Sequence, residues 1–555
     1  MYFVQEIATF WLFATVLSVE LIVIESKIYT STASIQRLLN IESHLNTIVK
    51  SFVDLHAEKV EQMHAFVDEI IGDNEQDRSA GSVSVTNPVN AFLAVRRLNM
   101  WIEFLDDFVN DDGMENFKTA LKRFKETHEI PTDEDVEGAI GGLFRLQNTY
   151  NLTVSDLLLN QLNSGKRKKI KRRKLDAYDA IVIARHAYDV DDFHQSLQWS
   201  AGAQMLFESE KDAQITDEYL DALYILTDSL ILQGNPDHAK QVASLLESVD
   251  SDFNKTVRFP SLYQNDNENA EKSTTKTQIK NEKVPSNLAI QILNPRQNVS
   301  DQMLAYESLC RNERRPQMST QESMNGVQLY CYLDFGRSNA NPSSVLAPNA
   351  IEIVNLSPKI LIIRNAVTQQ FAQFYKDLAV EQMKDSIVES QTRTDSKAKF
   401  DQISKTAYFH KNNTAHNLPV YKVTASFTNS NPAFYEGLQV VNYGLAGQDE
   451  YHFNWMTNGG ADLNVDKYDN LLATLLLMLE CPTAGGATIF PALNLTVFLN
   501  SGDALLWMNR KSNGYIDRTT KHAGCPVLVG NKWIAYQRIK AHGNEPSHQC
   551  RTAEV

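Results

Sequence analysis

Two histidines mark the stretch of this sequence whose residue types could do chemistry. His452 lies in the segment His-Phe-Asn at 452–454, and His522 follows 70 positions later. Residues i and i+2 of a β-strand point to the same face, so a His-x-Asp segment and a second His from a distant strand can bind Fe(II) on one face. Lys532, ten positions after His522, can pair with a carboxylate of a cosubstrate.

Three segments around these residues resemble the catalytic domain of the collagen prolyl 4-hydroxylase α subunits, which are 2-oxoglutarate- and Fe(II)-dependent dioxygenases. They read YGLAGQDEYHF at 443–453, AGGATIFP at 484–491 and HAGCPVLVGNKW at 522–533. Three separated matches in the same order are a specific signal. The resemblance implies that His452 and His522 bind iron, that Lys532 binds the distal carboxylate of 2-oxoglutarate, and that L-ascorbate restores oxidised iron.

Asn454 departs from this pattern, because the family has Asp two residues after the first His. The implied metal set is therefore His452, Asn454 and His522, and a neutral amide oxygen in it should weaken Fe(II) binding. The nearby carboxylates that could compensate, none of which has the His-x-Asp spacing, are Asp449, Glu450 and Asp462. Two hypotheses stay open. One is a procollagen-proline 4-dioxygenase α subunit acting on X-Pro-Gly sequences, weakened by Asn454. The other is a catalytically inactive paralogue that acts as a proline-rich-peptide-binding or assembly subunit.

The length of 555 residues suggests three or four domains, and 43% hydrophobic residues are enough for globular cores. A net charge of −15 argues against general nucleic-acid binding. The run at 166–174 is nevertheless strongly basic. We interpret it as a solvated loop, with binding to an acidic partner surface as the alternative.

The sequence predicts a multidomain α+β protein. In chain order, and using the resemblance, the predicted parts are a signal peptide (1–26), an N-terminal helical and coiled-coil dimerisation region (27–160), a tetratricopeptide-like peptide-substrate-binding domain (175–250), a linker (258–290) and a double-stranded β-helix, or jelly-roll, dioxygenase domain (345–545). Candidate strands of the last domain, which also has a helix near 369–383, are 360–363, 438–443, 451–455, 472–479, 488–490, 496–499, 504–507 and 527–537.

The N-terminal apolar run at 8–24 is interrupted by Glu20 and reads as a secretory signal peptide. A signal anchor is the alternative, because no Lys or Arg precedes the run and no clean small-residue cleavage site follows it. Glycosylation sequons agree with a lumenal glycoprotein and occur at Asn151, Asn254, Asn298, Asn412 and Asn494.

Five cysteines are consistent with the secretory route. By the resemblance, Cys310 pairs with Cys331 and Cys525 with Cys550, which leaves Cys481 as a buried thiol at the end of an apolar strand. The resemblance also implies protein disulfide isomerase as the β subunit of an α2β2 tetramer in the endoplasmic reticulum lumen, and procollagen-like proline-rich chains as substrates.

Apolar residues recur at alternating three- and four-residue steps over 34–71, starting with Leu38, Ile41 and Leu45. This spacing predicts a long amphipathic helix whose apolar seam suits a coiled coil or a helical hairpin. We favour self-association, because the family's α subunits dimerise through their N-terminal helices. Packing within one chain is the alternative.

Helical periodicity in paired segments predicts one tetratricopeptide-like unit in 175–250, with a turn at 234–236. The family's unit of this kind holds polyproline II chains in a tyrosine-lined groove, and Tyr188 fits that role. Ile225 and Asp228 stand near positions where further tyrosines are expected. The preference for proline-rich chains is therefore expected to differ from that of a groove with more tyrosines.

Overall fold

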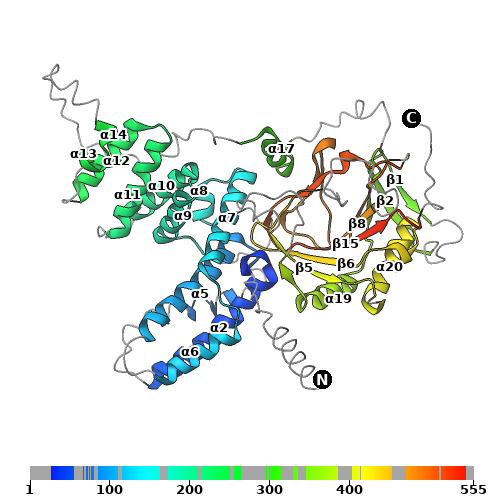
Figure 1. The fold of residues 1–555 in the computed structure, drawn as a ribbon, viewed down its shortest axis with the longest axis horizontal. Helices are drawn as coiled ribbons and strands as arrows, with labels where there is room; N and C mark the ends of the chain where they lie inside the picture. Colours follow the sequence, from blue (N-terminus) through cyan, green and yellow to red (C-terminus); the bar gives the residue numbers. More distant parts are fainter. Residues whose placement is uncertain are drawn as a thin grey trace, which may run out of the picture.

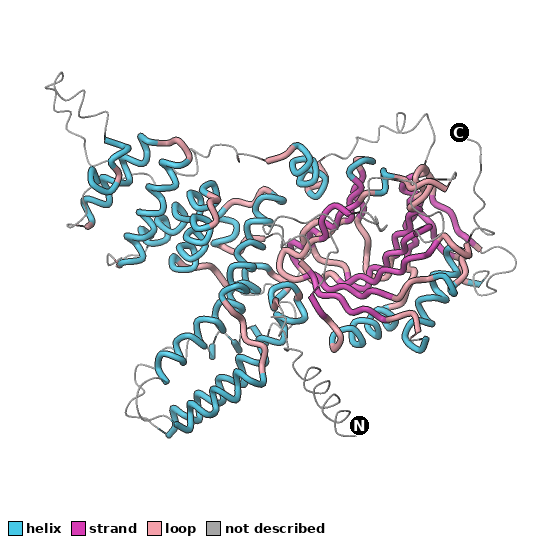
Figure 2. The backbone as a smooth tube through the Cα atoms, in the orientation of Figure 1, coloured by secondary structure: helices cyan, strands magenta, loops and turns pink. Residues whose placement is uncertain are grey.

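The structure is a computed structural model, drawn as a ribbon in Figure 1 and as a tube in Figure 2. The residues that it describes are 27–55, 67, 71–72, 74–75, 77–79, 85–109, 115–162, 173–209, 216–250, 255–263, 296, 299–313, 329–335, 346–385, 403–412, 414–452, 471–511 and 514–544. The predicted signal peptide lies outside them. Within the described residues no helix has the length and hydropathy needed to cross a bilayer.

The C-terminal half is built on antiparallel sheets. The largest sheet of the described part has the strand order β1 (Cys331–Asp334), β2 (Asn349–Asn355), β3 (Ile360–Arg364), β12 (Ala504–Met508), β8 (Leu471–Glu480), β15 (Trp533–Lys540), β6 (Leu438–Tyr443), β5 (Ser404–Phe409) and β4 (Lys384–Asp385). A smaller sheet has the order β11 (Leu495–Val497), β10 (Thr488–Phe490), β13 (His522–Gly524) and β7 (Asp449–His452). A third pairs β14 (Val527–Val529) with β9 (Ala484–Gly485).

Strand β8 shows why the large sheet has two buried faces. Leu475 and Leu477 point toward a core shared with helices α19 (Gln369–Val380) and α20 (Thr414–Thr428), which cover the outer face (Figure 1). Leu476 and Met478, on the alternate positions, belong to a second core that also contains residues of the smaller sheet. A continuous apolar run is what a strand covered on both sides requires.

Most of the predicted strands form, and the differences have local causes. The strands predicted at 438–443 and 488–490 form with those bounds. The one predicted at 527–537 is two strands, because the chain turns between them at Gly530, whose φ of +106° favours glycine. Strand β5 escaped prediction because its first three residues, 404–406, are all polar. One of them, Lys405, is nevertheless only 3% exposed.

The N-terminal helices are α2 (Thr32–Leu55), α5 (Pro88–Val109), α6 (Glu115–Thr127), α7 (Asp133–Tyr150) and α8 (Val154–Leu158). Helices α2, α5 and α6 form an arm that extends away from the sheets, whereas α7 lies next to the sheets (Figure 1). Leu38 and Leu45 of α2 lie in one core with Trp101 of α5 and Phe124 of α6. The described part of the predicted seam therefore packs within one chain, which is the alternative that we did not favour. Self-association remains a prediction.

A second helical group follows, with α9 (Ala177–Asp189), α10 (Phe193–Ser209), α11 (Asp217–Leu232), α12 (Pro236–Val249), α13 (Lys255–Arg258) and α14 (Pro260–Tyr263). The predicted turn at 234–236 is present, with Gly234 at φ +75° and Pro236 at the start of α12. The first residues of the linker predicted at 258–290 belong to this helical group. Phe259 and Leu262 are buried in the core of α11 and α12, so their burial adds this segment to the helical group.

The basic run at 166–174 lies outside the described residues except at its end. There Arg173 is 11% exposed in its side chain and lies 3.6 Å from the buried Asp77 carboxylate. At this residue the prediction of a solvated loop is wrong, because the guanidinium is drawn into the helical arm by a buried acidic partner.

The segment before α2 connects the helical arm to the sheets. Its 3₁₀ turn, η1 (Ile28–Thr30), is fully buried. The carbonyl of Tyr29 accepts a 3.1 Å hydrogen bond from the backbone N–H of Leu445, and the Ser31 hydroxyl donates to the Asn442 side chain at 2.7 Å. These contacts hold the chain between β6 and β7 in place, directly before the His452 strand.

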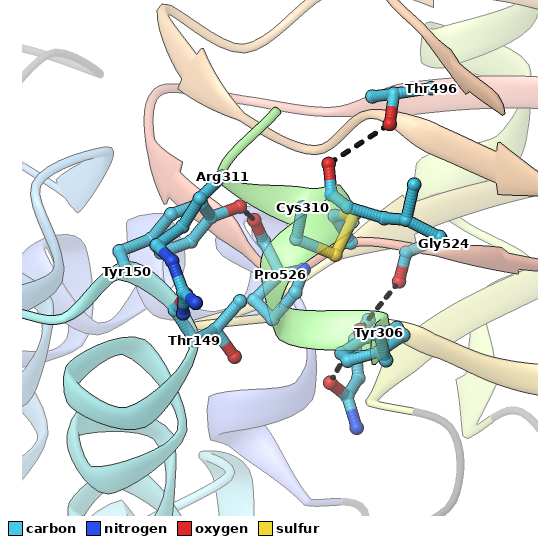
Figure 3. Close-up of a disulfide and its surroundings, with 11 residues drawn as sticks. Thr149, Tyr150, Tyr306, Cys310, Arg311, Thr496, Gly524 and Pro526 are labelled. Atoms are coloured by element: carbon cyan, nitrogen blue, oxygen red, sulfur yellow. Dashed lines mark hydrogen bonds between the residues drawn. A yellow bond between two sulfur atoms is a disulfide. The ribbon is translucent and has the colours of Figure 1, made fainter. Parts of the chain in front are cut away.

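A disulfide joins helix α17 (Asp301–Cys310) to the smaller sheet (Figure 3). It links Cys310 with Cys525, whose Cα atoms are 5.6 Å apart. Nearby, the Tyr306 hydroxyl donates a 3.3 Å hydrogen bond to the carbonyl of Gly524, and Arg311 donates to the carbonyl of Thr149 on α7 at 2.9 Å.

The predicted disulfide pairing is therefore wrong in this structure. Cys310 packs against β13, in a buried cluster with Cys525, whereas Cys331 is exposed and unpaired on β1, an edge strand of the large sheet. Cys550 lies outside the described residues. Cys481 is a free thiol, as predicted, but it is half-buried rather than buried.

Replacing Gly444 with Ala tests the contact between the N-terminal segment and the sheets. A Cβ at this position would overlap the backbone carbonyl of Tyr29, which cannot move independently of the buried turn. We expect G444A to lower the free energy of unfolding by about 2 kcal/mol or more, measured by chemical denaturation.

The matched control is G141A on α7, where a Cβ meets nothing within 4 Å. An alanine there should be neutral or stabilising by up to about 1 kcal/mol, because glycine is a poor helix former. Equal effects of the two substitutions would contradict this account of the junction.

Candidate metal and cosubstrate site

The pairing of β7 with β13 brings the two predicted histidines together. His452 lies directly opposite His522 in the register, and their ring centroids are 4.4 Å apart. Residues opposite each other on antiparallel strands present their side chains on the same face. Two imidazoles that lie 70 positions apart in the sequence are thus brought side by side.

His522 is buried at 1% exposure. Its Nδ1 lies 2.9 Å from the carbonyl of Thr520, which can only accept, so Nδ1 carries the proton and Nε2 keeps its lone pair. Burial lowers the pKa of His522 well below its usual value, and the neighbouring His452 lowers it further. The rings of Trp507 and Phe490 lie 4.8 and 5.7 Å from it, between centroids. A neutral imidazole with an unprotonated Nε2, set among aromatic rings, is suited to bind a metal.

Asp449 lies on the same side of β7 as His452. The register pairs His452 with His522 and Asp449 with Gly524, so three steps on β7 match two on β13. This irregularity is a β-bulge, and a bulge turns a residue to the face opposite to the one that simple alternation predicts. As a result an Asp449 carboxylate oxygen lies 3.6 Å from Nδ1 of His452, and Asp449 is 6% exposed.

The described residues supply two of the three ligands that the sequence implies. Asn454 lies outside them, so its position relative to the histidines is not described. Among the described residues no set of three or more His, Cys, Asp or Glu side chains is arranged to hold a metal ion. The histidine pair fits two positions of a facial Fe(II) site, and the described residues do not supply the oxygen ligand that would complete it.

Lys532 is buried beside the same strand. It is 1% exposed, and its Nζ lies 4.5 Å from the centroid of the Tyr443 ring. A Cβ built on Gly524 would lie 3.4 Å from this Nζ and 3.3 Å from the Cβ of Asp449. The ammonium, the carboxylate and the bare glycine backbone therefore face one small region at the end of β13.

Burying the charged ammonium of Lys532 at this position costs free energy of folding. Burial lowers its pKa to about 8, and the nearby Asp449 carboxylate opposes that shift. No carboxylate oxygen of the described residues lies within 4 Å of the ammonium. A buried cation that makes no salt bridge within the described part of the chain fits a site that is completed by a ligand carboxylate.

The spacing of residues on β13 sets the distance between the histidine pair and the Lys532 ammonium. Gly524, next to the ammonium, is two residues after His522 on β13, which corresponds to about 7 Å. A small dicarboxylate can bridge such a distance, with one end at the histidines and the other at Lys532.

Comparisons with known proteins find similar sequences that cover almost the whole chain. The family model for the N-terminal region of the prolyl 4-hydroxylase α subunit matches residues 31–164. Prolyl 4-hydroxylase subunit alpha-2 of Caenorhabditis elegans is 28% identical over 533 residues, which cover 95% of this chain and 94% of that protein. Human prolyl 4-hydroxylase subunit alpha-1 is 27% identical over 539 residues, which cover 95% and 96%.

The chain is thus similar to prolyl 4-hydroxylase α subunits over 95% of its length. Among solved structures, a viral collagen prolyl hydroxylase from Paramecium bursaria Chlorella virus-1, in complex with 2-oxoglutarate, is 23% identical, with a TM-score of 0.27. The match covers 33% of this chain and 96% of that one.

Tyr188, which was predicted to bind substrate, lies in the helical group and not in the histidine site. It is a half-buried residue of α9 whose ring meets that of Phe193 at 5.6 Å, edge to face. Its hydroxyl bonds to the carboxylate of Asp228 on α11, and burial, aided by Asp228, raises the pKa of Tyr188. Asp228, which the sequence marked as the loss of an aromatic, therefore orients the tyrosine.

Sequence reasoning underestimated Asp449 and did not single out Tyr443. Asp449 was one of three carboxylates set aside for lacking the His-x-Asp spacing, and only the bulge brings it to the site. Tyr443 begins the matching segment at 443–453, but its contact with Lys532 depends on the distance between β6 and the end of β13. The residue pattern of a single strand cannot predict a contact between side chains of two different segments.

Replacing Lys532 with Met should stabilise the ligand-free protein. The native pKa of about 8 lies below the 10.5 of a free lysine, so the folded state binds fewer protons between these values. The cost of burying the charge is therefore complete below about pH 8 and disappears as the pH rises toward 10. K532M should raise the free energy of unfolding by about 1–3 kcal/mol at pH 7.

The check is thermal unfolding of both proteins at pH 7 and pH 10, where the advantage of K532M should shrink. The control is K422M, at an exposed position on α20, which should change stability by less than about 0.5 kcal/mol. A melting temperature of K532M at or below that of the unchanged protein at pH 7 would show that the ammonium is not buried at a cost.

Proposed function

We propose that this chain is the catalytic α subunit of a procollagen-proline 4-dioxygenase, which hydroxylates proline in X-Pro-Gly sequences with 2-oxoglutarate and O2. The observation that carries the proposal is the pairing of His452 with His522, with Lys532 buried beside the same strand. The similarity to prolyl 4-hydroxylase α subunits over 95% of the chain supports it.

In this proposal the chain's own residues bind, orient and exclude water. His522, through Nε2, and His452 would hold Fe(II), with the amide oxygen of Asn454 as the weaker third ligand. Lys532 would bind the distal carboxylate of 2-oxoglutarate as a compact charge. Trp507 packs against His522 and limits access of water. The bound iron and 2-oxoglutarate would supply the oxidising power for the C4–H bond of proline, and L-ascorbate would return oxidised iron to Fe(II).

The finer architecture belongs to the same proposal. The two antiparallel sheets share a core, with Leu476 and Trp507 from the larger and Phe490 from the smaller, and this supports a double-stranded β-helix, or jelly roll. Helices α9 to α12 pack in sequence as antiparallel neighbours, which supports a tetratricopeptide-like unit. Tyr188 would contact polyproline II chains there.

We further propose that the protein works in the endoplasmic reticulum lumen, with protein disulfide isomerase as β subunit and with self-association of its N-terminal helices. The disulfide between Cys310 and Cys525 supports an oxidising compartment. The sequon residues Asn151, Asn412 and Asn494 are exposed and accessible to glycosylation.

Because of Asn454 we also consider a second function. An inactive paralogue that binds proline-rich peptides or assists assembly would need the helical groove but not a metal site. The neutral residue at 454 favours it. The costly burial of Lys532 disfavours it, because a protein without a cosubstrate gains nothing from that charge.

The decisive test is formation of 4-hydroxyproline in a Pro-Pro-Gly repeat peptide. The full chain, produced with protein disulfide isomerase, is compared with N454D, and H522A is the negative control. We expect turnover by the unchanged protein and an increase of about tenfold or more in N454D, because a carboxylate binds Fe(II) more tightly than an amide. Turnover in N454D alone would show that the natural chain is the inactive paralogue. Turnover in neither would refute the enzyme proposal.

Binding of the same peptide tests the role of Tyr188. Y188A should weaken the affinity by about tenfold, because an aromatic contact surface is lost. Y188F keeps the ring and removes only the hydrogen bond to Asp228, so it should weaken binding by no more than about threefold. Titration calorimetry measures both, and unchanged affinity in Y188A would place the groove elsewhere.

A further inference from the structure

Asp449 places a negative charge beside the region that the proposed cosubstrate must occupy. Its Cβ and the ammonium of Lys532 both lie within 3.5 Å of the same point, the position of a Cβ on Gly524. On its other side the Asp449 carboxylate is 3.6 Å from Nδ1 of His452. It therefore lies between the metal end and the lysine end of the site.

The groups around the Asp449 carboxylate shield it from water. Asp449 is 6% exposed, and Tyr443 and Tyr536, which flank Lys532 and Asp449, are 0% and 7% exposed. Burial raises the pKa of both tyrosines above the usual range, and the Asp449 charge adds to that rise. Water screens a charge poorly in such surroundings, so an anion beside Asp449 is repelled more strongly than at a surface.

We propose that Asp449 is a specificity-determining residue, which shares the charge of Lys532 and thereby selects against a distal carboxylate on the 2-oxo acid. This inference rests on the proposed function, because it assumes that a 2-oxo acid binds between the histidines and Lys532. The Asp449 charge then offsets part of the positive charge at the lysine end of the site. The site binds a dicarboxylate less tightly, and it discriminates less against a 2-oxo acid with an uncharged tail.

In this proposal Asn454 and the charge of Asp449 affect the same property, the affinity for 2-oxoglutarate. The sequence has Asn454 where the family has a carboxylate, and Asp449 lies at the other end of the same site. Among the described residues the site keeps the carboxylate of Asp449, which lies 3.6 Å from Nδ1 of His452 and acts on Lys532 through its charge, but which is not in the predicted ligand set. Both features lower the affinity for 2-oxoglutarate.

The test compares two ligands in four proteins. Titration calorimetry on the full chain loaded with Mn(II), which does not turn over, measures the dissociation constants of 2-oxoglutarate and of 2-oxovalerate, which has no distal carboxylate. The proteins are the unchanged chain, D449N, K532M and the double variant. D377N is the control, because Asp377 is an exposed carboxylate on α19. Each is also measured with N454D, which strengthens metal loading.

We expect D449N to bind 2-oxoglutarate about tenfold more tightly or better, with 2-oxovalerate changed less than about twofold. The gain should disappear in the double variant, because it depends on Lys532. D377N should behave like the unchanged protein. This ratio between two ligands is not altered by a substitution that merely destabilises the fold.

Three outcomes would overturn the inference. If D449N binds 2-oxoglutarate equally or more weakly, Asp449 does not repel the distal carboxylate. If both ligands gain equally, the effect is a change in the shape of the site and not in its charge. If no protein binds either ligand, including those with N454D, the proposed function itself is wrong. Binding of 2-oxoglutarate that is unaffected by D449N leaves the proposed function standing and refutes this inference alone.

Discussion

The site depends on one short strand pairing, that of β7 with β13. Its register puts His452 opposite His522, and its bulge turns Asp449 to the same side. A slip of one residue would reverse the side chains of either strand and separate the imidazoles. The pairing itself covers few residues, so its precision must come from what surrounds it. On one side the disulfide and Tyr306 hold the end of β13, and on the other the buried segment around Tyr29 holds the chain that leads into β7.

This arrangement explains why a distant part of the sequence matters to the chemistry. The turn η1 and helix α7 contact the loop before β7, and helix α17 contacts β13, so three helical elements support two strands. The stability gained from their burial allows the site to hold groups that are unfavourable by themselves. Lys532 and His522 are nearly inaccessible to water, and neither would be buried there for stability. Such groups are typical of positions that bind ligands.

The sequence predicted the elements well and their contacts only in part. His452, His522 and Lys532 were identified because the motifs around them are long. Strand β8 was identified because a strand buried on both faces is apolar throughout. The disulfide partners were predicted wrongly, because pairing depends on which strand α17 packs against. The place of Asp449 was not predictable, because a bulge breaks the alternation from which a strand's faces are inferred. The helix α2 seam was ambiguous because the same spacing serves packing within and between chains.

The central claim is that the histidine pair and Lys532 together bind a metal chelated by 2-oxoglutarate. Anaerobic titration of the full chain with Fe(II) and 2-oxoglutarate measures this directly, since a 2-oxo acid chelated to Fe(II) absorbs visible light by charge transfer. The account predicts a saturable band at one Fe(II) per chain, which is absent in H522A and needs more 2-oxoglutarate in K532M. No band at saturating Fe(II) and 2-oxoglutarate, in a correctly folded protein, would contradict it.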